Sequence, residues 1–357
     1  MSRKIENKFR YSYSRNGTRK DCLRKYYYSY YMHWEGWLVR QGLSEVLKDR
    51  NYSHEIQKKI AYTFKKSATK YTFIGNFLHE AIENTLFDLD KGKVITNCKE
   101  YVADQIYRFE KQLGEAVDDQ ISNRFLDKPK DHLFFVEYLN SPSFIYGPKK
   151  AKEVSWEWFK ADAAKLFRLN LVNYFTSGLY ESLVKFREDC DIFEVEKEIY
   201  VDFTFNSHHG DETVRLSVKP DLFTVTKDGT LSIFDWKTGS LKNIKMDQLD
   251  YYGYIFSKLI QSDPQYSKVN RIMEKVYCLK ESAPITKEFD PHEPHESTLT
   301  SHLRMMSLLT DTGLEENKVS HENIDRFEQK VNKGLFGCRA CPFLLMCPGT
   351  MEKLKLD

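Results

Sequence analysis

Two aspartates and a lysine have the residue types and spacing for metal-dependent chemistry. Asp235 and Lys237 lie two residues apart in an apolar run, 230–237, that is typical of a β-strand, so both side chains should point to one face. Asp221 lies in an earlier run, 216–226, which we also expect to be a strand. Carboxylate oxygens suit Mg²⁺ or Mn²⁺, and a divalent cation would relieve the repulsion between the two carboxylates. The alternative is an Asp–Lys ion pair on a solvated sheet face.

The loop between the two strands decides whether the aspartates can meet. A two-residue loop, Asp228-Gly229, would send Asp221 and Asp235 to opposite faces of the sheet. A three-residue loop that begins at Lys227 pairs position 226 with 230, and position 221 then lies opposite 235. Glycine in third place suits the left-handed residue of such a loop. We therefore predict the longer loop and a positive φ at Gly229.

Two helices are expected to carry further polar groups toward this cluster. Gln248 and Tyr252 are spaced i,i+4 on a predicted helix that runs to about residue 260, so they share a face. Apolar residues recur at helical spacing over 73–89, and His79 lies beside the apolar stripe. A histidine in this position is either an ordinary core or surface group or, as a neutral imidazole, a metal ligand.

Taken together, these segments resemble a known nuclease family. Lys219-Pro220-Asp221, followed by Asp235-Trp236-Lys237-Thr238-Gly239, resembles the PD-(D/E)xK nuclease signature. The Gln248/Tyr252 pair resembles the QxxxY motif of the RecB-like branch. The segment Gly75-Asn76-Phe77-Leu78-His79-Glu80 resembles the helix that supplies that branch's histidine ligand.

The resemblance assigns a role to each residue of these motifs. It implies a divalent ion held by His79, Asp221, Asp235 and the backbone carbonyl of Trp236. Lys237 would position the attacking water and stabilise the charge that develops. The catalytic residues would then be Asp221, Asp235 and Lys237. Gln248 and Tyr252 would contact the DNA backbone.

Four of the seven cysteines form a second candidate site. Cys338 and Cys341 form a CxxC motif, and Cys347 follows after five residues. Three thiols this close in a reduced compartment indicate a metal site rather than a disulfide. Cys22, in a basic and tyrosine-rich segment, is the candidate for the fourth ligand. Four thiolates fit either zinc or an iron–sulfur cluster, and spacing alone does not separate the two.

The cysteine arrangement is similar to that of the iron-staple nucleases. This group includes AddB-type subunits of helicase–nucleases, CRISPR-associated RecB-like exonucleases and eukaryotic exonuclease five. The resemblance implies a [4Fe–4S] cluster on Cys22, Cys338, Cys341 and Cys347. The other cysteines are isolated, and we expect ordinary thiols at Cys98, Cys190 and Cys278.

The expected fold is α/β, with a restriction-endonuclease-like mixed central sheet flanked by helices. It also has a helical insert and an iron–sulfur cluster that joins the N- and C-terminal segments.

The expected activity is that of a metal-dependent DNA nuclease, an exonuclease on single strands or DNA ends, in repair, recombination or antiviral defence. A separate helicase or CRISPR adaptation-type protein is the expected partner. The alternatives are a non-catalytic DNA-end-binding or scaffolding subunit of such a complex and a zinc-stabilised binding module.

We expect four regions along the chain. They are a basic N-terminal segment with the first cluster cysteine (1–34), a helical region with the histidine helix (35–190), the nuclease core sheet (191–280), and C-terminal helices with the remaining cysteines (281–357). A strand is expected over 193–205, where Glu196 and Glu198 either approach the metal or, as we favour, lie on a solvated face. A polar loop is expected over 283–296.

Composition fits an ordinary globular protein. The chain has 357 residues, of which 41% are hydrophobic and 30% charged. Its net charge is only +2, so DNA affinity must come from local patches, such as the nine Lys and Arg residues of segment 1–25. No stretch approaches the roughly 20 apolar residues of a membrane span, and the start lacks the apolar core of a signal peptide. We therefore expect a cytoplasmic protein without membrane contact.

Overall fold

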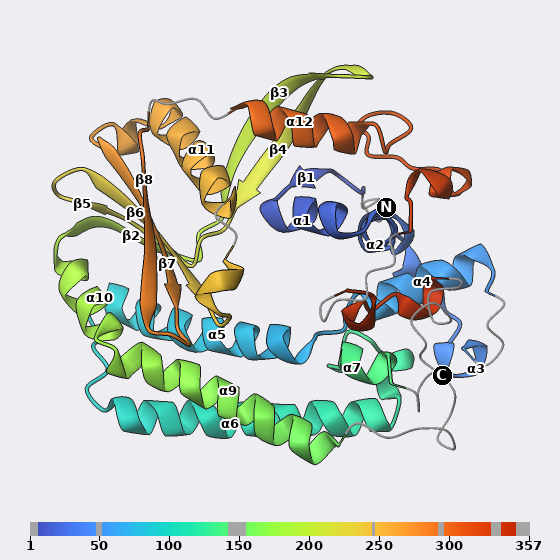
Figure 1. Ribbon diagram of the computed structural model, residues 1–357, viewed down its shortest axis with the longest axis horizontal. Coiled ribbons are helices and arrows are strands. Elements are labelled where there is room, and N and C mark those ends of the chain that lie inside the picture. Colours follow the sequence, from blue (N-terminus) through green and yellow to red (C-terminus); the bar gives the residue numbers. More distant parts are fainter. Residues whose placement is uncertain are drawn as a thin grey trace, which may run out of the picture.

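The hairpin that carries the two aspartates lies inside a five-stranded sheet of order β2-β5-β6-β7-β8 (Figure 1). The computed structural model describes residues 6–47, 52–141, 155–244, 247–291, 296–329 and 337–347. In this sheet β6 and β7 are parallel, and the other neighbours are antiparallel. The strands are β2 (Cys190–Val195), β5 (Leu222–Thr226), β6 (Thr230–Lys237), β7 (Arg271–Cys278) and β8 (Ala283–Phe289).

A second sheet has three strands in the order β1-β4-β3. The strands are β1 (Arg10–Tyr11), β3 (Ile199–Ser207) and β4 (Gly210–Val218). β1 runs parallel to β4, and β3 runs antiparallel to it. The N-terminal segment therefore joins the sheet formed by the middle of the chain. The mixed sheet expected from the sequence is divided into two mixed sheets.

Helices account for most of the remaining described chain. The α-helices are α1 (Tyr13–Asp21), α2 (Leu23–Tyr27), α3 (Leu43–Val46), α4 (His54–Phe64), α5 (Lys70–Asp90), α6 (Cys98–Ile121), α7 (Val136–Leu139), α9 (Trp156–Thr176), α10 (Leu179–Glu188), α11 (Asp247–Ser262) and α12 (Glu296–Ser307). A π-helix spans Tyr28–Met32, and short 3₁₀ turns span Gly36–Leu38, Arg124–Leu126, Leu241–Asn243, Pro264–Tyr266, His321–Arg326, Cys338–Ala340 and Leu344–Met346. None of the helices in the described ranges is long and apolar enough to cross a membrane.

Both faces of the five-stranded sheet are covered, which explains why β5 and β6 are buried along nearly their whole length. Phe223 and Ile233 on one face pack with Phe256 of α11 in one core cluster. Trp236 on the other face packs in a second cluster with residues of α5, α6, α9 and α10, such as Phe167. α11 follows β6 and links it to its parallel neighbour β7.

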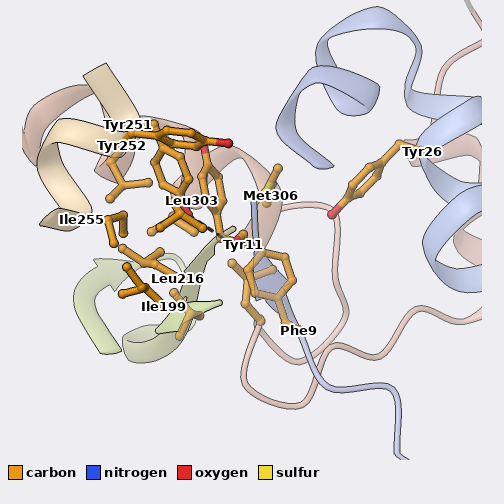
Figure 2. Close-up of a cluster of buried hydrophobic side chains, with 14 of the residues drawn as sticks. Phe9, Tyr11, Tyr26, Ile199, Leu216, Tyr251, Tyr252, Ile255, Leu303 and Met306 are labelled. Carbon is orange, nitrogen blue, oxygen red and sulfur yellow. Dashed lines mark hydrogen bonds between the residues drawn. The ribbon is translucent and has the colours of Figure 1, made fainter. Parts of the chain in front are cut away.

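The N-terminal arm is anchored in the first of these clusters. Figure 2 shows Phe9 and Tyr11 beside Leu216 of the second sheet, Tyr251 of α11 and Met306 of α12. The Tyr251 hydroxyl donates to the backbone oxygen of Tyr11 at 3.2 Å, and the two rings meet edge to face. The arm, α11 and α12 therefore share one core.

Three sequence expectations differ from the structure. The run 216–226 is not one strand, because β4 ends before Pro220, which has no backbone N–H to donate to a ladder, and β5 belongs to the other sheet. The run 193–205 is similarly divided at Glu196, which has a left-handed φ of 53°. The expected loop 283–296 begins with β8, while 292–295 lie outside the described residues.

Candidate active site

The hairpin register places the two aspartates opposite one another. Position 222 pairs with 234 and 225 with 231, so 226 faces 230 across a three-residue loop. Gly229 has a φ of 86°, in the left-handed region that favours glycine. The predicted register is therefore confirmed, although Asp221 lies just before β5 and not inside a strand.

Asp221 uses both carboxylate oxygens within the site. Oδ1 lies 3.0 Å from Nδ1 of His79, and Oδ2 accepts the backbone N–H of Trp236 at 2.6 Å. Burial lowers the pKa of His79, but the hydrogen bond to Asp221 and its charge outweigh that effect and raise the pKa above its ordinary value. α5 thus brings the histidine to the strand end that the motif resemblance implied.

Glu196 is the site residue that sequence reasoning placed elsewhere. The ligand atoms of His79, Glu196 and Asp221 lie within 4.8 Å of one another, so Glu196 is not on a solvated strand face. The left-handed turn at Glu196 ends β2 and lets its N–H donate to the backbone oxygen of Asp221 at 3.1 Å. Burial raises the pKa of Glu196, while an ion pair with Lys219 opposes the increase. Periodicity held no signal for this position, since the break follows from the two-sheet arrangement.

Asp235 and Lys237 form an ion pair beside these three residues. The distance from Oδ2 of Asp235 to Nζ of Lys237 is 2.6 Å, as expected for strand residues on one face. Burial raises the pKa of Asp235 to about 6, with Lys237 opposing the increase and Asp221 adding to it. Only 6% of Asp235 is exposed, so its charge is costly without a partner cation.

Gln248 and Tyr252 approach Asp235 from α11. Nε2 of Gln248 lies 3.5 Å from Oδ1 of Asp235 and donates to the Tyr252 hydroxyl oxygen at 3.1 Å. The predicted helix and shared face are confirmed. Gln248 lies against the Asp235 carboxylate. Contact of the pair with a nucleic acid backbone stays a prediction. Coordination of a divalent ion by the backbone carbonyl of Trp236 also stays a prediction.

The donor set at the strand end fits a hard divalent cation. His79, Glu196 and Asp221 offer one nitrogen and carboxylate oxygens at a spacing that one ion could bridge. Asp235 adds a further buried carboxylate next to them, as its electrostatic coupling to Asp221 and His79 shows. Mg²⁺ and Mn²⁺ are the metals that this set suits.

A third buried carboxyl group lies on β7 next to the site. Glu274 is fully buried on the strand beside β6, at the level of Ile233. Burial raises its pKa to about 9, with Lys287 opposing the increase and Asp250 adding to it. Glu274 is therefore protonated at neutral pH, and the sequence motifs did not indicate it.

The four candidate cluster cysteines are free thiols. Cys341 and Cys347 pack against the first core cluster. Burial raises the pKa of Cys341 to about 11, and the nearby sulfurs of Cys22 and Cys338 add to the increase. In the described ranges no three cysteine sulfurs lie within 4.8 Å of one another, so a [4Fe–4S] cluster is not shown.

One comparison with known proteins identifies a family. The family model of the PD-(D/E)XK nuclease superfamily matches residues 10–348. No curated protein matches the chain. A solved structure titled "Crystal structure of SSO0001" matches 60% of this chain and 85% of its own at 13% identity, with a TM-score of 0.27, which is too low to support an argument. The family match spans most of the sequence and includes every motif of the acidic site, so the chain belongs to the PD-(D/E)XK nuclease superfamily.

Proposed function

We propose that the protein is a divalent-metal-dependent deoxyribonuclease that degrades single-stranded DNA or DNA ends as an exonuclease. The observation that carries the proposal is the convergence of His79, Glu196 and Asp221 within 4.8 Å, beside the Asp235–Lys237 pair. A scaffolding subunit would have no physical need for three costly carboxylates and a lysine in one buried group.

Each residue of the site has a distinct role in this proposal. His79, Glu196, Asp221 and Asp235 hold the cation. When bound, the ion polarises the scissile phosphate and lowers the pKa of a water molecule. Lys237 positions that water and stabilises the negative charge that develops on the phosphate.

The helix α11 keeps this group in place. Gln248 holds the Asp235 carboxylate and is itself held by the Tyr252 hydroxyl, which is nearly buried. The exposed part of this pair contacts the DNA backbone. A helicase or CRISPR adaptation-type partner, and a role in repair, recombination or defence, remain predictions.

We also propose a [4Fe–4S] cluster on Cys22, Cys338, Cys341 and Cys347. The electrostatic coupling of Cys347 to the other three sulfurs supports it, because such coupling requires proximity. A spacing of 4.8 Å suits ligands of a single ion, whereas a four-iron cluster holds its thiolates further apart. The donor set is four thiols, which fits iron–sulfur ligation.

The exonuclease proposal is tested with two single-stranded substrates of one sequence, one linear and one covalently closed. Both are incubated with the protein and Mg²⁺ or Mn²⁺, and products are resolved on a denaturing gel. An exonuclease shortens the linear strand progressively and leaves the circle intact. Cleavage of the circle at the same rate would instead make the enzyme an endonuclease, and no cleavage of either would refute the nuclease proposal.

A further inference from the structure

A group of cations surrounds Tyr30, away from the acidic site. We call Arg15, Tyr30, His33, Lys65 and Lys66 the Tyr30 cluster. The guanidinium carbon of Arg15 lies 4.4 Å from the Tyr30 ring centroid, and the Lys65 ammonium lies 5.3 Å from it. Nζ of Lys65 is 3.1 Å from Nε2 of His33. Lys66 follows Lys65 directly beyond the end of α4.

The electrostatic environment of this cluster is one-sided. Partial burial and the charges of Lys65, Lys66 and Arg15 lower the pKa of His33 to about 3. Partial burial and the charges of Lys66 and Arg15 lower the pKa of Lys65 to about 8. Within the described ranges no carboxylate acts noticeably on either group. Like charges held this close repel unless an anion is bound.

Several exposed or half-exposed lysines elsewhere in the chain have carboxylate partners. Lys20 pairs with Asp247, Lys197 pairs with Glu194, and Lys318 pairs with Glu316. Lys65 differs from these lysines, because no carboxylate among the described residues acts noticeably on it.

His33 adds a buried polar atom that lacks a partner. An ammonium can only donate, so Nε2 of His33 accepts a hydrogen bond from Lys65, and in the neutral ring Nδ1 then carries the hydrogen. This Nδ1 is buried and has no hydrogen-bond partner among the described residues. A neutral, donating imidazole beside two lysines is suited to an anion and not to a cation.

The two lysines are exposed to solvent and can reach a ligand, whereas Arg15 is buried. Both lysine side chains are exposed at the end of α4. Arg15 is buried, and its nitrogens donate to the Tyr26 hydroxyl and to the backbone oxygen of Arg10. Arg15 thus contributes a fixed positive charge behind the lysines.

The position of the lysines relative to the acidic site suits a bound strand. Lys66 precedes the start of α5 by four residues, and His79 lies nine residues into that helix. The distance between the two sites is therefore at most roughly 28 Å, from about 14 Å of linker and about 14 Å of helix. At the rise of about 3.4 Å per nucleotide that a strand has in a duplex, roughly eight nucleotides span that distance, and a more extended single strand needs fewer. Figure 1 shows α5 running from the α4 side of the molecule to the strand ends.

We propose that Lys65 and Lys66 bind a phosphate group of the nucleic acid strand whose cleavage occurs at the acidic site. The proposal rests on the nuclease function proposed above and adds a second anchor for its substrate.

The test is the salt dependence of DNA binding. A 3′-labelled thymidine oligonucleotide is titrated with protein by fluorescence anisotropy, without divalent cation, at several salt concentrations. The variant Lys65→Gln/Lys66→Gln should bind more weakly, and the slope of log K against log salt should be shallower by about 0.7, the amount that one lost phosphate contact removes. Lys65→Arg/Lys66→Arg should keep the wild-type slope.

A matched control removes the same charge elsewhere. Lys99 and Lys111 are exposed on α6, and Lys99→Gln/Lys111→Gln should leave the slope unchanged. Oligonucleotides with and without a 5′-phosphate separate the two sources of the anion. If the salt slope of Lys65→Gln/Lys66→Gln differs from that of wild type on both oligonucleotides, the lysines bind an internal phosphodiester. If the two slopes differ only on the 5′-phosphorylated oligonucleotide, the lysines bind the terminal phosphate.

Two failures can be told apart. Suppose that the wild-type protein cleaves DNA with Mg²⁺ or Mn²⁺, but that the glutamine variant and the α6 control have the same slope of log K against log salt. The phosphate site is then wrong and the nuclease function stands. If the wild-type protein neither binds nor cleaves DNA, both proposals are wrong.

Discussion

Asp221 connects three chain segments through one carboxylate and the backbone beside it. It contacts His79 from α5, the backbone of Trp236 in β6, and the backbone of Glu196 at the end of β2. The sequence predicted the first partner through a motif resemblance and the position of Asp235 through strand register. It did not predict Glu196, because the turn at this residue depends on how the two sheets separate.

Glu274 gives a prediction at the residue scale. Its pKa is about 9 in the folded protein and about 4.5 in an unfolded chain. Between these values the folded state keeps a proton that the unfolded state releases, so the free energy of unfolding falls as pH rises, by at most about 1.4 kcal/mol per pH unit. Glu274→Gln should remove this dependence.

Urea denaturation at about pH 7.5 and about pH 8.5 measures the effect above the range in which Asp235 titrates. The wild-type protein should lose stability between the two pH values, and Glu274→Gln should lose clearly less. Glu288→Gln, an exposed change on the neighbouring strand β8, should behave like wild type. Parallel pH profiles for all three proteins would show that Glu274 is not protonated in the folded state.

At the scale of elements, the hairpin β5–β6 could be predicted from the sequence, but the strand breaks in the segments that precede it could not be fully predicted. Glycine at the third loop position specified the register, because the left-handed conformation needs it. The apolar runs 193–205 and 216–226 each supply strands to two sheets, and alternation alone does not show where the chain changes sheet. Pro220 was a break signal in the sequence, because proline has no N–H for a strand ladder, whereas the left-handed φ of Glu196 is known only from the structure.

Gly229→Ala tests the turn. The new Cβ would lie 2.5 Å from the backbone oxygen of Lys268, in addition to the strain of a positive φ. Gly178 also has a positive φ, but a Cβ there meets no atom within 4 Å. Gly178→Ala should therefore cost about 1–2 kcal/mol, and Gly229→Ala should cost clearly more. Chemical denaturation compares the two, and equal costs would mean that the hairpin turn relaxes freely.

At the scale of the whole molecule, the two ends of the chain pack together. The Tyr28 hydroxyl donates to the backbone oxygen of Met346 at 2.8 Å, and Nε of Arg24 donates to that of Phe327 at 2.9 Å. The sequence predicted this association through the cysteine resemblance. It did not predict the three-stranded sheet in which β1 pairs with β4, because a two-residue strand has no periodicity to detect.

Cys22→Ser tests the proposed cluster at this scale. A cluster bound only by the folded protein stabilises it through binding energy, so a lost ligand should lower both iron content and melting temperature. Cys98→Ser, on helix α6, should change neither the iron content nor the brown colour that an iron–sulfur cluster gives to the protein. Iron and sulfide assays on anaerobically purified protein decide the matter. Full iron content in Cys22→Ser would mean that Cys22 is not a ligand.

The most direct measurement of the central claim is the single-turnover cleavage rate of end-labelled single-stranded DNA with Mg²⁺ or Mn²⁺. Asp235→Asn keeps the side-chain shape but removes a carboxylate from the buried site, so the rate should fall roughly 100-fold or more. Asp202→Asn, an exposed change on β3, should cleave like wild type. If Asp235→Asn retains the wild-type rate while remaining folded, the acidic group at the strand end is not the catalytic site.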